Sequence, residues 1–205
     1  MKTKGFIDQY GWSAVPRLFK AVLRKFGIII ETFFLLKYKL NEIDITHKFN
    51  QYNYSDVREL TEEDISKIKF VSSEKLEIYK NRFHSGNYSC YAIIKNKEIQ
   101  YLTWISWSDM NYPTVFEKNE DLKPEEALLE DSFCSPEHRG QGYHSMMNIF
   151  RLKKILDKQK SEVLALVLKE NKPALKVQLK SGFYFDSRIK FIKIGKWIKI
   201  FQQKI

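Results

Sequence analysis

Two glycines stand one residue apart behind an arginine in the stretch "PEHRGQGYH", residues 136–144. An apolar run, "EALLEDSFC", precedes them and a helix-like run, "SMMNIFRLKKIL", follows, so the chain turns here from strand into helix. The first amides of a helix lack partners within the helix, and the helix dipole is positive at that end. Gly140 and Gly142 let the backbone approach a ligand closely, while Arg139 adds a cation suited to phosphate. The stretch predicts a cradle for a phosphate or pyrophosphate, with a tight connection that binds nothing as the alternative.

Two common nucleotide-binding patterns do not describe this turn. No "GK[ST]" follows the glycines, so it is not a P-loop, and their spacing differs from the G-x-G-x-x-G fingerprint. The longer stretch "EDSFCSPEHRGQGYH" closely resembles the coenzyme-A-binding motif of the GCN5-related N-acetyltransferase (GNAT) superfamily. In that family a strand runs into an R/Q-x-x-G-x-G/A turn and a helix. A second strand follows, then an Asn that opens a helix ending in Gly-Phe; here "LALVLKENKPALKVQLKSGF" supplies Asn171 and Gly182-Phe183.

The remaining elements agree with this resemblance, which covers about residues 54–195. Hydrophobic patterning predicts a strand, two helices, three strands, a helix, a strand, a helix and a terminal hairpin around Gly195-Lys196. The predicted fold class is α/β (α+β), with a mixed, largely antiparallel central sheet, helices on both faces and a GNAT-like acyl-CoA N-acyltransferase architecture. We expect a basic amphipathic helical extension over residues 1–45 and the GNAT-like domain over residues 46–205.

The resemblance implies a donor substrate, acetyl-CoA or another acyl-CoA, and no metal. It implies that the pantetheine arm pairs with the strand edge at Phe133 and Cys134, and that Asn171 contacts the same arm. It implies a pyrophosphate site formed by Arg139, Gly140, Gln141, Gly142, Tyr143 and His144. His144 stands where the family has Gly or Ala; we expect its side chain to turn away from the cofactor, with a phosphate contact as the alternative.

The catalytic positions depart further from the family. Many members have a Tyr, thought to protonate the departing thiolate, where this chain has Gln178, and an amide is no useful proton donor at neutral pH. Glu130 and Asp131 on the central strand are the candidates for the base, and we expect Glu130 to act, with both as surface or structural carboxylates as the alternative. The acceptor side is expected to use Trp104, Trp107 and His84, although ordinary core packing explains Trp104 equally well.

These assignments predict an enzyme that moves an acetyl group directly to a primary amine of a small molecule, with amino sugars as one class. One alternative is a transferase that uses a longer acyl-CoA or an acyl carrier protein. Another is a catalytically silent module that only binds acyl-CoA.

Charge and composition bear on partners and location. The net charge of +10 lies at the ends: residues 1–40 hold eight Lys and Arg against two acids, and residues 188–205 hold six and no acid. The segment 15–26, "VPRLFKAVLRKF", predicts a basic amphipathic helix that packs on its own domain or a second subunit, or binds an anionic membrane or an acidic carrier protein.

The longest apolar run, residues 26–36, is too short for a transmembrane helix, which needs about 20 residues. Two cysteines form no disulfide framework. We expect a cytoplasmic protein, either free or peripheral at the inner membrane face, with no specific nucleic-acid partner and with a homodimer as one assembly.

Overall fold

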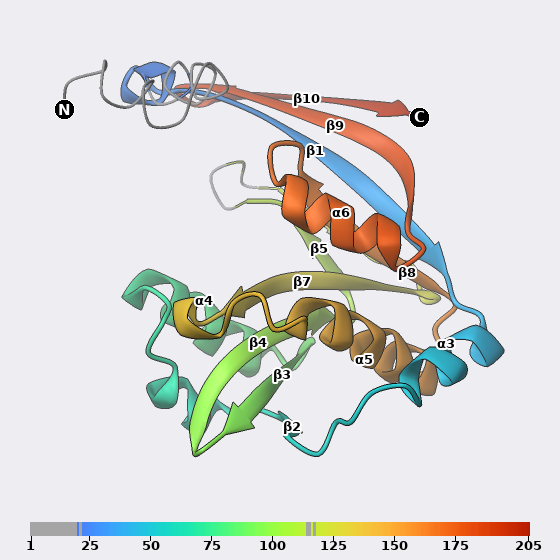
Figure 1. Ribbon diagram of the computed structural model, residues 1–205. Helices are drawn as coiled ribbons and strands as arrows, with labels where there is room; N and C mark the ends of the chain where they lie inside the picture. Colours follow the sequence, from blue (N-terminus) through green and yellow to red (C-terminus); the bar gives the residue numbers. More distant parts are fainter. Residues whose placement is uncertain (1–19, 21, 114–115, 117) are drawn as a thin grey trace.

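The computed structural model describes residues 20, 22–113, 116 and 118–205 (Figure 1). In chain order its elements are β1 (Ile28–Lys39), α3 (Glu42–Phe49), β2 (Val57–Glu59), the 3-10 helix η2 (Glu62–Lys67), α4 (Ser73–Ser85), β3 (Tyr88–Lys95), β4 (Glu98–Ser106), β5 (Asp109–Asn111), β6 (Asn119–Asp121), β7 (Glu126–Cys134), the 3-10 helix η4 (Pro136–His138), α5 (Tyr143–Asp157), β8 (Glu162–Leu168), α6 (Lys172–Lys180), β9 (Tyr184–Ile194) and β10 (Trp197–Lys204).

Eight of the strands form one sheet in the order β10-β9-β1-β8-β7-β4-β3-β2, while β5 and β6 form a separate ribbon. All neighbours in the large sheet are antiparallel except β7 and β8. With helices on both faces, this is the mixed, largely antiparallel fold that the sequence predicts.

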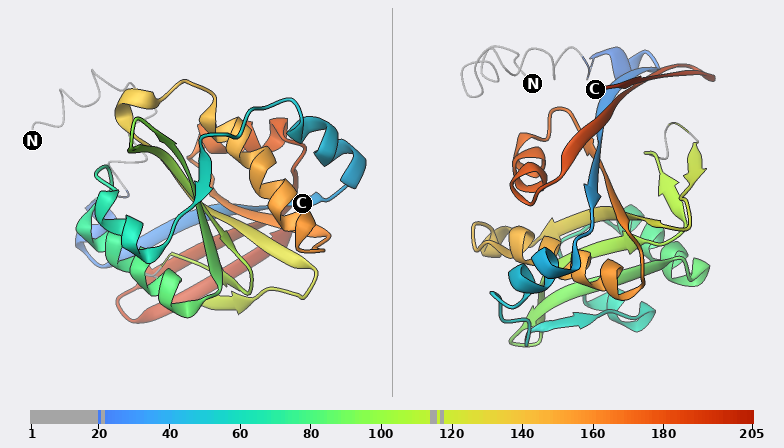
Figure 2. Two further views of the ribbon diagram at one scale, coloured as in Figure 1. Left: turned by 90° about the horizontal axis from the view of Figure 1, so that it is seen from below. Right: turned by 90° about the vertical axis from the view of Figure 1, so that its right-hand side faces the viewer.

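The parallel pair β7 and β8 divides the sheet into two half-sheets. They pair only from Glu126 and Glu162 to Leu129 and Ala165. Beyond that point β7 and β8 diverge, and no strand of the described chain lies beside residues 130–134 of β7 on that edge. Figures 1 and 2 show the first half-sheet (β7, β4, β3, β2) with α3, α4 and α5, and the second half-sheet (β8, β1, β9, β10) with α6.

Side chains alternate along the strands of the first half-sheet and build a core on each face. In β4, Tyr101 and Ile105 join the core beneath α5, whereas Leu102 and Trp104 join the core beneath α4. Because both faces are covered, α4 and α5 lie on opposite sides of β7. Side chains of β7 therefore reach the split between β7 and β8 either on the α4 side or on the α5 side.

The predicted helical extension over residues 1–45 is wrong for residues 28–39, which form β1. This strand lies between β8 and β9, so the sheet begins well before the predicted boundary at residue 46. Phe33 and Leu35 are buried on one face of β1, and Leu36 and Tyr38 on the other. An internal strand covered on both faces is a continuous apolar run, which periodicity alone does not separate from a helix.

Only part of the predicted amphipathic helix over residues 15–26 can be compared. Residues 20 and 22–25 are helical, while residues 1–19 and 21 lie outside the described residues. The terminal hairpin is present as predicted, with β9 and β10 joined at Gly195. Among the described residues, no helix is long and apolar enough to span a bilayer.

Candidate functional site

The glycine turn connects the end of β7 to α5 through η4. Gly140 and Gly142 both have positive φ angles, +84° and +77°, which glycine adopts without the steric cost that other residues meet. A Cβ atom placed on either glycine would find no other atom within 4 Å. The turn therefore needs glycine for its backbone conformation and leaves open space beside it.

Among the described residues, three backbone amides of this turn have no acceptor. Gly142 caps α5 without a side-chain hydrogen bond, and the first turn of α5 has no acidic residue. Within the described chain, no backbone or side-chain group bonds the amides of Gly140, Gln141 or Gly142. Arg139 is exposed beside them. Free amides, the positive end of the helix dipole and a guanidinium together form the predicted anion cradle.

The side chains of Tyr143 and His144 turn into the protein, so only their backbone amides can serve the cradle. The Tyr143 hydroxyl donates to Gln100 Oε1 at 2.8 Å. His144 Nδ1 lies 3.2 Å from the Tyr101 hydroxyl. Burial, helped by the charge of Arg151, lowers the pKa of His144 from 6.5 to about 4, so the imidazole is neutral at pH 7. The ring therefore adds no positive charge for a phosphate.

The unpaired edge of β7 starts at a β-bulge. Thr103 pairs with Ser132 but Trp104 pairs with Glu130, which leaves Asp131 as the extra residue. Phe133 packs against the core beneath α4. Cys134 is half-buried, and burial raises the pKa of its thiol, which disfavours the nucleophilic thiolate. At this edge β7 offers backbone hydrogen-bonding groups rather than a reactive side chain.

A buried arginine holds this bulge from the α5 side. Arg151 is fully buried and donates to the carbonyl oxygens of Glu130, at 3.1 Å, and Trp104, at 3.3 Å, and also to Asn148 Oδ1. It forms no ion pair within the described chain. Burial lowers the pKa of Arg151 to about 10, so the guanidinium stays protonated at neutral pH. Neither its burial nor its role can be read from the local sequence.

A pocket of about 840 Å³ lies on the opposite face of β7. It is bounded by α4, the β5–β6 ribbon and the two diverging strands. Its lining residues are Phe33, Lys75, Ile78, Asn81, Arg82, Ser85, Tyr88, Asp109, Asn111, Tyr112, Pro113, Lys118, Asn119, Leu128, Leu129, Glu130, Asp131 and Leu166. Since the glycine turn begins α5 and this pocket lies against α4, the two features approach the split between β7 and β8 from opposite faces.

Glu130 faces this pocket within a network of charged groups. Its side chain is only 9% exposed and bonds Arg82, which also donates to Asp131 at 2.8 Å. Lys75 binds Asp131 at 2.7 Å. Glu130 Oε1 has no hydrogen-bond partner among the described residues. Burial raises the pKa of Glu130, and the attraction of Arg82 offsets only part of that rise. The predicted base is therefore a buried carboxylate with one oxygen unoccupied.

Arg82 lines the pocket and binds Glu130, and sequence reasoning missed it. It lies on α4, far from β7 in the sequence, and its guanidinium stands 5.1 Å from the ring of Tyr88 and 5.3 Å from that of Trp104. Arg82 and Glu130 are 48 positions apart in the sequence, so no local pattern pairs them.

The structure places the three predicted acceptor residues outside the lining of this pocket. Trp104 is fully buried, with its ring 4.9 Å from those of Tyr79 and Phe83, so it belongs to the core. Trp107 donates through Nε1 to Ser89 Oγ at 3.1 Å, and the exposed His84 pairs with Glu62 at 3.0 Å. None of the three lines the pocket. The strand alternation of β4 turns Trp104 inward, and the α4 surface that carries His84 faces η2.

Gln178 and Asn171 belong to the second half-sheet. Gln178 is buried, and its Oε1 accepts from Asn148 Nδ2 at 3.0 Å, which ties α6 to α5 across the split. Asn171 follows β8 and caps α6 by accepting from the Ala174 amide at 3.3 Å. Both residues thus have structural partners. The place of Gln178 at the family's catalytic Tyr position and the cofactor contact of Asn171 stay predictions.

Comparisons with known proteins identify the fold. No family model and no curated protein matches the sequence. A GNAT-family acetyltransferase from Colwellia psychrerythraea superposes with a TM-score of 0.55 at 14% identity, over 86% of this chain and 61% of that one. A tandem GNAT protein from the clavulanic acid biosynthesis pathway gives 0.54 at 12% identity, over 93% and 58%. A protein from Novosphingobium aromaticivorans assigned to the GNAT acetyltransferases gives 0.57 at 10% identity, over 82% and 66%. The chain spans between 58% and 66% of the length of these structures.

Proposed function

We propose that this chain, which has the fold of the GNAT acetyltransferases, transfers an acyl group from a coenzyme A thioester to a primary amine of a small molecule. One observation carries the proposal: the split between β7 and β8 has the anion cradle on one face and the pocket that Glu130 faces on the other. A two-substrate transfer needs such an opening, because the donor and the acceptor must meet there from different sides.

The donor half rests on the glycine turn and the unpaired edge of β7. The amides from Gly140 to His144, with Arg139 beside them, would hold the pyrophosphate of coenzyme A. The pantetheine arm would pair with residues 132–134 as an added strand. An amide on that edge would donate to the thioester oxygen as it gains negative charge. Arg151 acts as a positioning residue, because its bonds to Glu130 and Trp104 fix the bulge from which this edge begins.

The acceptor half rests on the pocket beneath α4. The amine nitrogen attacks the thioester carbonyl carbon, the carbon–sulfur bond then breaks, and coenzyme A leaves as its thiolate. The amine must lose a proton, which Glu130 would take directly or through a water molecule. Its raised pKa makes it a better base than an exposed carboxylate. Hydroxyl and amide groups from Tyr88, Asn111 and Tyr112 would suit an acceptor with hydroxyl groups, and amino sugars are one such class.

The direct experiment measures binding and turnover separately. Calorimetry with coenzyme A, acetyl-CoA and longer acyl-CoAs tests the donor site. Mass spectrometry with a panel of amino sugars, polyamines and amino acids tests transfer. The Glu130→Gln variant should bind acetyl-CoA normally and transfer slowly, whereas Glu77→Gln, on the exposed surface of α4, should match the wild type. The proposal fails if no acyl-CoA binds, or if acyl-CoA binds and no amine is acylated.

A further inference from the structure

The outer strands of the second half-sheet expose apolar and basic side chains on the same face. In the pairing of β9 with β10, Ile194 lies opposite Trp197, Ile192 opposite Lys199, and Lys190 opposite Phe201. Alternate residues of a strand and their cross-strand partners share a face. With Arg188, which precedes Lys190 on that face, these residues are called the hairpin surface.

The apolar members of the hairpin surface are open to solvent. Trp197 is 52% exposed, Ile194 50% and Phe201 46%. The N-terminal helical segment meets the hairpin at its turn, because the Gly195 amide donates to the Gly27 carbonyl at 3.1 Å. Phe26, which is 75% exposed, therefore lies near the hairpin turn and the neighbouring Trp197. Large apolar side chains thus cluster at one end of the molecule.

Three cations of the hairpin surface have no acidic partner among the described residues. Residues 187–205 contain six Lys and Arg and no Asp or Glu. In the part of the chain that the structure describes, Arg188, Lys190 and Lys199 form no ion pair; Arg188 donates to Gln203, and Lys199 lies 5.0 Å from the ring of Phe201. In the first half-sheet, by contrast, Lys75 and Arg82 bind carboxylates.

We propose that the hairpin surface binds the surface of an anionic phospholipid bilayer. Lipid phosphates would neutralise the cations, and the headgroup region would take up Trp197, Phe201 and Ile194. A second copy of the chain is a poorer occupant, because it would bring one acid-free basic surface against another. An acidic protein or a nucleic acid would satisfy the charges but leave Phe26 and Ile194 without an apolar environment.

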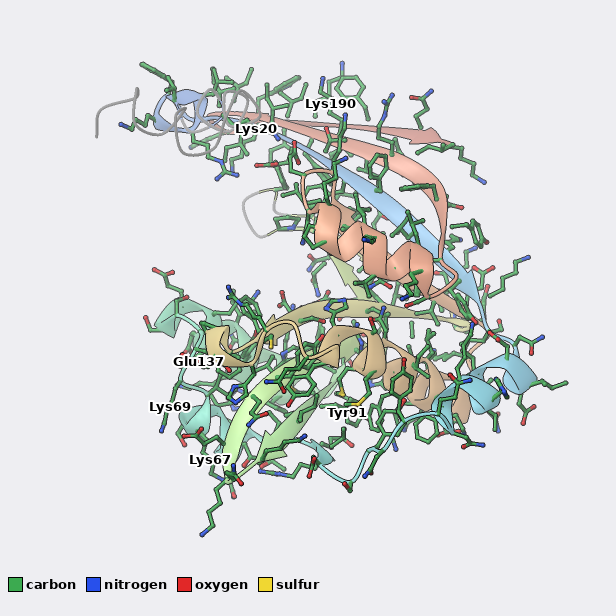
Figure 3. The ribbon with its side chains drawn as sticks, in the orientation of Figure 1. Lys20, Lys67, Lys69, Tyr91, Glu137 and Lys190 are labelled. Carbon is green, nitrogen blue, oxygen red and sulfur yellow. The ribbon has the colours of Figure 1, made fainter. Side chains whose placement is uncertain are left out.

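The position of the surface agrees with attachment at one end of the molecule. Figure 3 places Lys190 and Lys20 at the end that carries β9 and β10, and Lys67 and Lys69 at the far end of the first half-sheet. Lys20 binds Glu31 and Glu170, which fastens the helical segment to the second half-sheet. A bilayer bound at the hairpin surface would leave the first half-sheet facing water.

The test uses the full chain and vesicles of phosphatidylcholine, alone or mixed equally with phosphatidylglycerol. We expect cosedimentation with the mixed vesicles only, weakening as salt is added. Removing two surface cations should weaken vesicle binding about thirtyfold. The Lys190→Glu/Lys199→Glu variant also reverses the two charges, so its affinity for the mixed vesicles should fall by at least that factor. The matched variant Lys69→Glu/Lys158→Glu should bind like the wild type.

The apolar contribution has its own readout. Brominated lipid should quench the fluorescence of Trp197, and Trp197→Phe should therefore reduce the quenching of this chain, which has four tryptophans. Trp197→Ser/Phe201→Ser should weaken binding, whereas Tyr52→Ser, at an exposed aromatic residue elsewhere, should not. Circular dichroism confirms that each variant is folded.

Several outcomes would overturn the proposal. These are equal binding to neutral vesicles, no binding to either kind, and binding that the hairpin variants leave unchanged. If the wild type forms a dimer and binds no vesicles, and Trp197→Ser/Phe201→Ser dissociates that dimer, the surface belongs to a contact with a second copy. Binding to an acidic carrier protein but not to vesicles would assign it to that partner. None of these measurements needs acyl transfer, so the membrane proposal and the proposed function fail separately.

Discussion

Valine in place of Gly142 tests whether the glycine turn binds the donor. Gly142 and Gly195 both have positive φ, +77° and +57°, and a Cβ on either meets nothing within 4 Å. The folding cost of valine is therefore backbone strain at both sites, about 1–2 kcal/mol. For a chain of 205 residues this lowers Tm by roughly 2–8 °C. Gly195→Val, in the β9–β10 turn, is the matched control because it has the same strain and lies in a different turn.

The two variants should differ in binding. In Gly142→Val the isopropyl group enters the open space beside the free amides, where the pyrophosphate would lie. Loss of two hydrogen bonds to a charged group costs about 3–6 kcal/mol. That corresponds to a Kd for coenzyme A raised by about 10² to 10⁴. Gly195→Val should leave the Kd unchanged.

Calorimetry with coenzyme A and thermal unfolding of the wild type and both variants give all the values needed. Pantetheine, which lacks the pyrophosphate, should show the same affinity for all three proteins. The reasoning is refuted if Gly142→Val binds coenzyme A as tightly as Gly195→Val. It is also refuted if both variants lose affinity equally, because the loss would then follow from strain alone.

Three further predictions concern the buried groups. Glu130→Gln should lower the transfer rate about 10²-fold or more. Because the pKa of Glu130 is raised, the acidic limb of the wild-type pH–rate profile should lie above the usual carboxylate range, and this limb should disappear in the variant. An unchanged limb would exclude Glu130 as the base. The unfolded chain protonates His144 near pH 6.5 but the folded chain only near pH 4, so acidification through this window should cost up to about 3 kcal/mol of stability. His144→Gln, compared by urea unfolding at several pH values, should remove that part of the dependence, and identical curves would contradict it. Trp104→Ala should lower the free energy of unfolding by about 3–5 kcal/mol, as for a core residue, and a small change in urea unfolding would argue against that position.

The parts of the site that the sequence predicts correctly are those with local signals. The glycine turn needs positive φ at two positions, and only glycine adopts that conformation freely, so Gly140 and Gly142 mark it directly. The apolar run before the turn predicts β7 and the helical periodicity after it predicts α5, because both patterns are set by residues close together in the sequence. Asn171 caps α6, and Gly182 follows its end, as expected for those residue types.

The errors fall where the environment on both sides of an element decides its role. The predicted helical extension includes the residues of β1 because a strand covered on two faces has no polar alternation that would mark it as a strand. For Trp104 the sequence leaves a pocket position and core packing equally open, because an aromatic residue in a strand suits either. Its burial beneath α4 follows only from the packing of that helix on β4.

The sequence by itself determines the glycine turn and the types of the two elements that flank it, because backbone conformation and periodicity depend on neighbouring residues. It also determines the uneven charge of the chain, since residues 187–205 contain no acid. Only the tertiary structure decides that β7 and β8 separate after Leu129 and Ala165, that Arg82 binds Glu130, and that Arg151 holds the bulge from beneath. These features join residues distant in the chain, and their energies come from burial and from partners that exist only once the half-sheets and helices have packed.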